Sequence, residues 1–295
     1  MANAVATKNK AKSNKRTSLW MDVWRRLRKN KAAMLGLTII LFMVFCAIFA
    51  DFLAPYGFDD QNLKEKMQFP NSQHWLGTDN FGRDILSRII YGSRISLQVG
   101  LISVGVSIVV GGIFGAMAAF YGGKTDNIIM RAMDILMAIP GMLLAIAIAA
   151  ALGPGLGNMM IAIGVGSVPG YARVVRASVL TVRDEEFVEA ARSIGASDWR
   201  IIIKHIIPNA LAPIIVQATL GVAGAILSCA SLSFLGLGIS PPTPEWGAML
   251  SASRQYIRNY WYMATFPGIA IMLTVYALNV LGDGLRDALD PRLKN

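Results

Sequence analysis

Three places in the sequence hold residue types that could do chemistry, and the first imitates a phosphate-binding loop. Gly123, Lys124 and Thr125 match the end of that loop, in which backbone N–H groups cradle phosphates and the lysine reaches them. The full pattern also needs a glycine at position 118, which is Ala118 here, and a preceding β-strand. An uncharged apolar tract precedes this motif instead. The sequence therefore does not predict a nucleotide site on this chain.

The second place is His74, which could ligate a metal together with Asp79 or Asp84. The chain has only 2 His and shows no paired-ligand spacing, so we predict no metal site. The surrounding stretch "GTDNFGRD" (77–84) holds the Gly, Asp and Asn residues of tight turns. It predicts a folded external cap, or a re-entrant wedge beside a transport path.

The third place is Asp134, near the end of an apolar tract, where a charge at membrane depth is functional by default. The alternatives are simple pairing with Arg131 one turn earlier, or snorkelling to the headgroups, and both stay open. A membrane enzyme would need His residues or clustered acids within the apolar tracts, and a stand-alone secondary transporter would need paired ionisable residues there. We predict neither of these classes and no catalytic residue.

Long apolar helices must position these residues. Hydrophobic residues make up 54% of the 295 positions and charged residues 16%, a composition outside the soluble globular class. The uncharged tracts, divided at turns such as "GPGLGN" (153–158), predict an all-α polytopic membrane protein with six transmembrane helices. The expected spans are 32–50, 95–123, two within 135–172, 206–234 and 261–282.

The basic residues predict how the chain is oriented. Ten of its 28 Lys and Arg residues lie in the first 31 positions, which for a membrane chain is a topology signal and not a nucleic-acid site. Segment 173–204 is also basic, so both termini and this segment are expected in the cytoplasm. The predicted parts are a basic cytoplasmic tail (1–31), a first transmembrane helix (32–53), an extracytoplasmic segment (54–94), a five-helix core (95–283) with a cytoplasmic loop (182–207), and a cytoplasmic tail (284–295).

Loop 182–207 mixes charged and apolar residues, a pattern typical of helices that lie at a surface. We expect Asp184 to cap a first helix and Gly195 to end it in the left-handed geometry that glycine tolerates. Ser197 is expected to cap a second, short helix. Spacings of three and four predict one apolar face on the first helix, made of Phe187, Ala190, Ala191 and Ile194.

Prolines and small residues mark the expected helix contacts. Pro140 and Pro169 each fall inside a predicted span and are predicted to kink it, as flex points for opening the molecule on one side and then the other. Small residues predict close helix packing, within the subunit or across to a partner. They are Gly111 to Gly115, Gly221, Gly224, Ala225 and Ser228.

The pattern inside the loop resembles a known motif. "EAA", three residues, "G" and nine residues to "HIIP" are similar to the cytoplasmic loop motif of permease subunits of binding-protein-dependent ABC importers. The motif ends in Ile, any residue, Leu and Pro, so His205 and Ile207 depart from it. Four further stretches resemble the C-type permease subunit of dipeptide and oligopeptide importers, so that the likeness runs from about residue 20 to the end. They are "HWLGTDNFGRDILSRIIYGSRISL" (74–97), "MRAMDILMAIPGMLLAIAI" (130–148), "SFLGLGISPPTPEWGAML" (233–250) and "GDGLRDALDPRL" (282–293).

The resemblance implies a type I ABC importer permease fold and an energy-coupling role. The short helix around Ala196 to Trp199 would dock into a groove of a separate ATPase subunit. The implied coupling residues are Glu189, Ala190, Ala191, Gly195, Ala196, Ser197, Asp198 and Trp199. The implied signature of the external segment is Gly77, Thr78, Asp79, Gly82, Arg83 and Asp84.

The same resemblance implies the partners and the location. They are a homologous permease subunit, two ATPase subunits, an extracytoplasmic solute-binding protein and the lipid bilayer of a bacterial or archaeal plasma membrane, with no nucleic acid. This chain would bind no cofactor, because ATP and Mg²⁺ would sit on the ATPase subunits. The implied cargo is di- or oligopeptides, with nickel chelates, glutathione or another small solute as the alternative.

Overall fold

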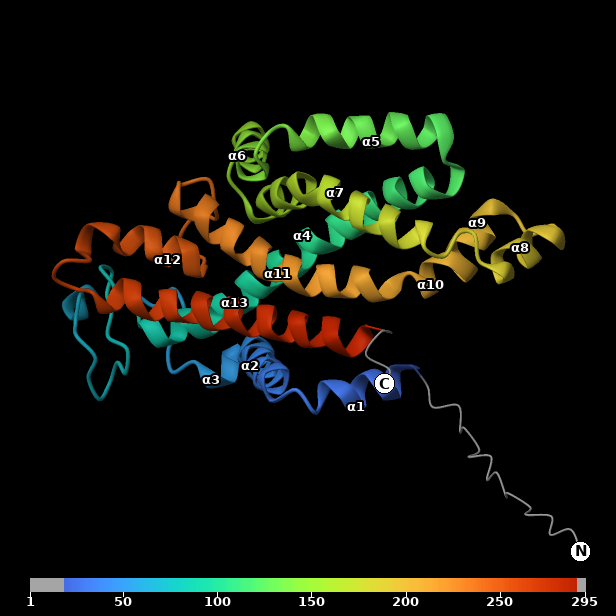
Figure 1. Ribbon diagram of the computed structural model, residues 1–295. Coiled ribbons are helices and arrows are strands. Elements are labelled where there is room, and N and C mark those ends of the chain that lie inside the picture. Colours follow the sequence, from blue (N-terminus) through green and yellow to red (C-terminus); the bar gives the residue numbers. More distant parts are fainter. Residues whose placement is uncertain (1–18, 291–295) are drawn as a thin grey trace, which may run out of the picture.

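The computed structural model describes residues 19–290, and these form helices joined by turns and loops (Figure 1). Within residues 19–290, the only β pairing is an isolated antiparallel bridge between Thr78 and Asp84. In chain order the helices of four or more residues are α1 (Leu19–Leu27), α2 (Lys31–Ile48), α3 (Ala50–Leu53), α4 (Ile85–Tyr121), α5 (Gly123–Met137), α6 (Gly141–Leu152), α7 (Leu156–Leu180), α8 (Glu186–Ser193), α9 (Asp198–Ile201), α11 (Leu211–Phe234), α12 (Trp246–Ser253) and α13 (Tyr262–Leu289). A five-residue π-helix (Ile202–Ile206) and α10 (Ile207–Asn209) join α9 to α11.

The membrane-spanning character lies in a subset of these helices. Within the described residues, α2, α4, α11 and α13 are each long and apolar enough to cross a bilayer, and α5 with α6 makes up to five spans if that bent pair counts as one. Helix α7 has 25 residues and is not in this set, because Arg173 and Arg176 and several glycines lower its hydropathy. The all-α membrane fold is therefore as predicted, and the count of six is approximate.

The second span begins ten positions earlier than predicted, at Ile85 and not at residue 95. The polar residues of this first part are helical because each finds a partner. Asp84 caps α4 by accepting a hydrogen bond from the Ser87 N–H at 2.7 Å. Arg88 donates to the Phe58 carbonyl at 2.8 Å, and Arg94 donates to the Ala47 carbonyl at 2.9 Å.

Pro140 corrects a prediction, because it lies between two helices and not inside one. Helix α5 ends at Met137, α6 begins at Gly141, and their axes differ by 84°. Proline has no N–H to continue the ladder, and the last turn of α5 tightens as Ile139 donates to the Leu136 carbonyl at 3.3 Å. The predicted kink is thus a full break. Pro169, by contrast, lies inside α7 as predicted.

The centre of the fold is the contact of α4 with α7, which runs across it beside α11 (Figure 1). Small residues bring the two backbones together: a Cβ on Gly111 would lie 2.7 Å from the Val168 carbonyl oxygen, and one on Gly115 would lie 2.3 Å from that of Ala172. These glycines pack within the subunit, which settles one of the two alternatives for them. The α4–α7 pair is therefore the main helix contact of the fold, and α11 packs against both helices.

The first and last described helices meet each other. Leu27 of α1 and Ala33 of α2 are buried against Leu281 and Ala288 of α13. The predicted tail 1–31 therefore includes a helix that packs on the fold, and α13 continues past the predicted end of the last span to Leu289. Residues 1–18 and 291–295, which complete the two predicted tails, lie outside the described residues.

Candidate functional site

Loop 182–207 lies at one end of the molecule, and α12 and segment 54–94 lie at the other (Figure 1). Helix α8 ends at a Schellman motif, in which the Gly195 N–H donates to the Arg192 carbonyl at 2.9 Å and the Ala196 N–H donates to the Ala191 carbonyl at 3.1 Å. Gly195 has φ +78°, a conformation that costs a residue with a Cβ. The predicted glycine hinge between two helices is confirmed.

One of the two predicted helix caps is wrong, and the other is right in position but lacks the side-chain hydrogen bond. Asp184 does not cap α8, which has Glu185 at its N-cap, because the Asp184 carboxylate accepts hydrogen bonds from Arg183 at 2.9 and 3.1 Å. This pairing lowers the pKa of Asp184. Ser197 does stand at the N-cap of α9, where its carbonyl accepts the first hydrogen bond of the helix from the Ile201 N–H at 3.0 Å, but its hydroxyl makes no capping hydrogen bond.

Most of the predicted apolar face of α8 is exposed, and a neighbouring face of the helix is buried. Phe187, Ala190 and Ile194 are exposed, whereas Val188 and Ala191 are buried. The buried pair packs into a cluster with residues from the ends of α4 and α7 and from the segment after α9. Members of this cluster are Phe120, Val175, Val179, Ile201, Ile202 and Ile206. Both faces satisfy helical spacing, and only the position of α4 and α7 selects between them.

The loop leaves large apolar side chains on its surface. Phe187 is 41% exposed, Trp199 59% and Ile194 85%. We call these three residues the loop surface. Of the predicted coupling residues, Ala191 is buried, Ala196 is half-buried, and the rest are exposed. These exposed positions are Glu189, Ala190, Gly195, Ser197, Asp198 and Trp199. Exposed apolar groups of this size mark a contact site, since leaving them in water is unfavourable.

Behind the loop surface, polar contacts tie the loop to the end of α4. The Arg192 guanidinium lies 5.1 Å from the centre of the Phe120 ring, a cation–π contact. Arg183 donates to the Ala119 carbonyl at 2.7 Å. Together with the buried cluster, these contacts hold the loop against the ends of α4 and α7.

The loop end of the α4–α7 pair also carries two ion pairs to α5. Asp134 accepts from Arg173 of α7 at 2.6 Å, a partner that differs from Arg131, the one named from the sequence. Asp126 makes a bidentate pair with Arg176, with both distances 2.6 Å. These two pairs fix α5 to α7. Gly123–Thr125, the phosphate-loop imitation, forms the start of α5 directly after α4.

The external-segment signature forms a hydrogen-bonded cap. The buried Asp79 carboxylate accepts from the Phe81 N–H at 2.8 Å, the Arg83 N–H at 3.0 Å and the Arg83 Nε at 2.7 Å. Arg88 of α4 lies 3.7 Å from the same carboxylate. The Thr78 hydroxyl donates to the Glu65 carbonyl and accepts from the Gln68 N–H. The signature therefore folds this segment onto the start of α4.

Gly77 and Gly82 of the signature have φ +80° and +73°. A Cβ on Gly82 would lie 1.8 Å from the Asn62 carbonyl oxygen, so the turn needs glycine. His74 is buried with its Nδ1 3.0 Å from Asp84 and its Nε2 3.6 Å from Glu65. No group of three or more His, Cys, Asp and Glu side chains within residues 19–290 is placed to hold a metal ion.

Glu245 and Trp246 were not singled out from the sequence, although the quoted stretch 233–250 contains them. Glu245 is 1% exposed and caps α12, accepting from the N–H groups of Gly247 at 2.8 Å and Ala248 at 2.7 Å. The fully buried Trp246 donates from its indole nitrogen to the Ile89 carbonyl at 3.0 Å. An acid directly after "PPTP" and before an apolar run was the available signal.

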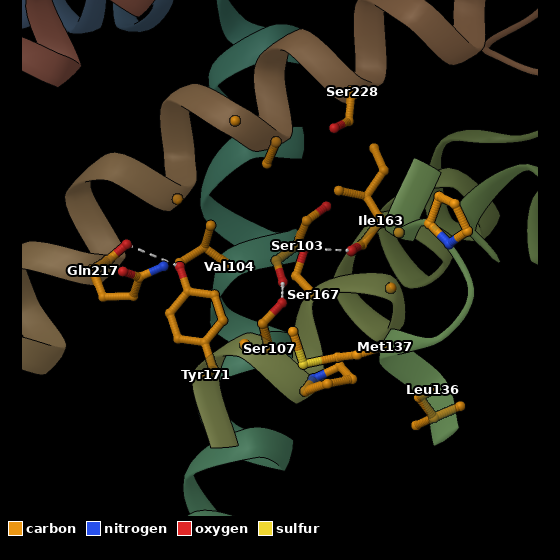
Figure 2. Close-up of a pocket in the computed structure, with 18 of the residues that line it drawn as sticks. Ser103, Val104, Ser107, Leu136, Met137, Ile163, Ser167, Tyr171, Gln217 and Ser228 are labelled. Carbon is orange, nitrogen blue, oxygen red and sulfur yellow. Dashed lines mark hydrogen bonds between the residues drawn. The ribbon is translucent and has the colours of Figure 1, made fainter. Parts of the chain in front are cut away.

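A cavity of about 390 Å³ lies between α4, α7, α11 and the α5–α6 break. Figure 2 shows its polar side chains converging from these helices. Both predicted flex points, Pro140 and Pro169, line it. So do the small residues predicted to make helix contacts on α11, namely Gly221, Gly224, Ala225 and Ser228. The polar side chains are Ser103, Ser107, Ser167, Tyr171, Gln217 and Ser228.

Two family models match the sequence. The one described as "Binding-protein-dependent transport system inner membrane component" matches residues 107–295, and the "N-terminal TM domain of oligopeptide transport permease C" matches residues 18–70. Among solved structures, an inward-facing form of the MetNI methionine ABC transporter superposes with a TM-score of 0.57 at 19% identity, over 70% of this chain and 98% of that one. A crystal structure of an amino acid ABC transporter gives 0.53 at 16% identity, over 68% and 94%. These two likenesses show the fold.

Relatives at higher identity extend over nearly the whole chain. The dipeptide transport system permease protein DppC of Alkalihalophilus pseudofirmus is 50% identical over 278 residues, 94% of this chain and 91% of that protein. The di/tripeptide transport system permease protein DppC of Pseudomonas aeruginosa is 47% identical over 93% and 92%. The glutathione transport system permease protein GsiD of Escherichia coli is 47% identical over 93% and 91%. This chain therefore belongs to the inner-membrane components of binding-protein-dependent transport systems, as a C-type permease of the peptide ABC importer family.

Proposed function

We propose that this chain is the permease subunit of an ATP-driven importer of short peptides and that loop 182–207 couples ATP hydrolysis to transport. The observation that carries the coupling role is the loop surface, where Phe187, Ile194 and Trp199 are exposed while the loop behind them is anchored to α4 and α7. An exposed aromatic on a rigid support is typical of the few residues that dominate a protein interface. The partner would be an ATPase subunit, whose ATP hydrolysis would drive transport.

The mechanism follows from the connections of the loop. Closure of two ATPase subunits would move the loop surface, and the buried cluster around Val188 and Ile201 would pass this displacement to α4 and α7. Both helices line the cavity, so the cavity would open to one side of the membrane and then to the other. ATP and Mg²⁺ would be bound by the ATPase subunits. This chain would transmit the movement of the ATPase subunits to the cavity and would catalyse no reaction itself.

The proposed assembly also contains a homologous permease subunit and an extracytoplasmic solute-binding protein. Loop 182–207 and both termini would lie in the cytoplasm, in agreement with the basic residues of 1–31 and 173–204. The cap formed by segment 54–94 lies at the opposite end of the molecule and would face the binding protein (Figure 1).

The cargo assignment rests on relatives that are named for dipeptide, di/tripeptide and glutathione transport. Short peptides are the chemistry that these names share. Glutathione is the second candidate, because the relative named for it is 47% identical.

Reconstitution in proteoliposomes tests the proposal. The chain, its paired permease and the ATPase subunits are placed in vesicles loaded with ATP, and the binding protein is added outside with a radiolabelled dipeptide. We expect uptake that stops when a non-hydrolysable ATP analogue replaces ATP, and that unlabelled dipeptide competes away. Uptake that persists without ATP would contradict the importer, and competition by glutathione but not by dipeptides would reassign the cargo.

A further inference from the structure

The cavity between α4, α7 and α11 has an uncharged polar lining. Among the described residues that line it there is no Asp, Glu, Lys, Arg or His, and its polar side chains are serines, Tyr171 and Gln217. A fixed charge in such a site would attract a solute of opposite charge and repel one of like charge. The lining is therefore suited to a solute that is recognised by hydrogen bonds and not by charge.

Three of the lining hydroxyls already have partners within the fold. Ser107 donates to the Ser103 and Gly164 carbonyls at 2.9 and 2.8 Å. Ser167 donates to the Ile163 carbonyl at 3.1 Å. Tyr171 donates to the backbone carbonyl of Gln217 at 3.2 Å (Figure 2). The hydroxyl hydrogens of these groups are therefore already used within the fold and are not available to a solute.

Three other polar groups have no such partner. The Ser103 hydroxyl belongs to a residue that is only 1% exposed, and it makes no hydrogen bond within the described chain. The Gln217 amide and the Ser228 hydroxyl also line the cavity without a hydrogen bond to any described residue. A buried hydroxyl without a partner is costly, so the Ser103 hydroxyl would gain a hydrogen bond from a polar molecule that enters the cavity.

We propose that Ser103, Gln217 and Ser228 bind the backbone amides of a peptide as it passes through this subunit's part of the transport path. This inference rests on the proposed function and names the recognising groups. A hydroxyl and a carboxamide can each donate and accept, which matches the N–H and C=O of a peptide bond. Because the backbone is common to all peptides and the lining carries no charge, this site would not select among peptide side chains by their charge.

Two glycines keep the path open. A Cβ on Gly170 of α7 or Gly224 of α11 would meet no atom within 4 Å, although both residues line the cavity. Gly105 and Gly112 of α4 are equally free of neighbours but are not among the lining residues. Leucine is a better helix former than glycine, so the change to leucine at these positions fills space without a backbone penalty.

The first test compares Gly224→Leu with Gly112→Leu in the reconstituted transporter. We expect Gly224→Leu to reduce dipeptide uptake by about tenfold or more while the ATPase activity stimulated by the binding protein is retained, because the path is blocked and the coupling loop is intact. Gly112→Leu should transport like the wild type. Equal uptake by the two variants would overturn the assignment of the path.

The second test uses Gln217→Glu, which adds a charge with little change in shape. We expect the ratio of basic to acidic dipeptide uptake to rise by about tenfold, from the interaction of unit charges in a partly buried site. Gln217→Leu should lower the uptake of neutral, basic and acidic dipeptides alike. An unchanged ratio in Gln217→Glu would overturn the inference while leaving the importer standing. Failure of the wild type to transport any dipeptide would overturn both.

Discussion

Truncation of Trp199 is the perturbation that most directly probes the loop surface. The side chain is 59% exposed, so its removal takes little from the packing of the subunit itself. Trp75 of segment 54–94 is 70% exposed and lies toward the other end of the chain's fold, which makes Trp75→Ala a matched control. We expect Trp199→Ala to weaken the association with the ATPase subunits and Trp75→Ala to leave it unchanged.

The expected magnitude follows from the exposed fraction. A large aromatic side chain presents about 150–250 Å² for burial. With 59% of Trp199 exposed, about 90–150 Å² remains for a partner to cover, worth about 2–4 kcal/mol at about 25 cal/mol per Å². Ordering of the interface and imperfect packing reduce this gain, so we take the lower end. A loss of about 2 kcal/mol corresponds to about thirtyfold weaker binding.

The assay is the binding of purified ATPase subunits to the permease pair in nanodiscs, titrated at one salt concentration. Thermal unfolding of the same nanodiscs checks that Trp199→Ala is folded, and its midpoint should match that of the wild type within a few degrees. ATP-driven uptake should fall with the affinity. Wild-type affinity for Trp199→Ala, with a normal melting midpoint, would refute the docking role of the loop surface.

The remaining predictions concern the cap, the hinge and the α5 contact. Asp79→Ala leaves the Arg83 guanidinium, which is 5% exposed, without its counter-charge. We expect denaturant titration of the cap to show a loss of about 3–5 kcal/mol in the free energy of unfolding. A loss below about 1 kcal/mol would contradict a buried ion pair. Gly195→Val should weaken binding of the ATPase subunits, because a residue with a Cβ pays about 1–2 kcal/mol of backbone strain at a φ of +78°. Gly195→Asn should largely preserve binding. Equal effects of the two substitutions would argue against the left-handed hinge. Asp126→Ala removes the bidentate pair with Arg176. We expect the rate of amide hydrogen exchange to rise in α5 and to stay the same in α11. An unchanged rate in α5 would show that the pair does not hold this helix in place.

The correct predictions concern residues whose conformation or close contact depends on the residue type itself. Gly195 was predicted as a left-handed hinge because few other residues adopt positive φ, and it has φ +78°. Gly111 and Gly115 were predicted in close helix contacts for a similar local reason, the lack of a side chain. The length of the apolar tracts likewise predicted the all-α membrane fold.

The errors arose where two local solutions compete. Asp184 was expected to cap α8, but the neighbouring Arg183 offers a charged partner at 2.9 Å. Phe187 and Ile194 on one face of α8, and Val188 on another, both satisfy helical spacing, and the ends of α4 and α7 decide which face is buried. Pairing of Asp134 with Arg173, 39 positions away, requires the tertiary arrangement of α5 and α7.

The cavity was the least accessible feature from the sequence. Gly224 and Ser228 were interpreted as packing residues, and their place on the wall of a cavity depends on where α7 and the α5–α6 break lie relative to α11. Pro140 predicted a disturbance of the helix, but a proline alone does not specify an 84° break. Both features depend on helices that are distant in the sequence.

Site-specific crosslinking at Ile194 tests the central claim most directly. Ile194 is 85% exposed at the loop surface, so Ile194→Cys should not disturb the fold. The native Cys46 and Cys229 are first replaced by serine or alanine. In membranes that contain the whole transporter, a short reagent is attached through its maleimide to the cysteine at residue 194, and its photoreactive end inserts into any neighbouring chain on illumination. We predict that residue 194 is joined to an ATPase subunit and that Trp75→Cys gives no such product. A crosslink of residue 194 to the binding protein, or none to the ATPase, would contradict the account.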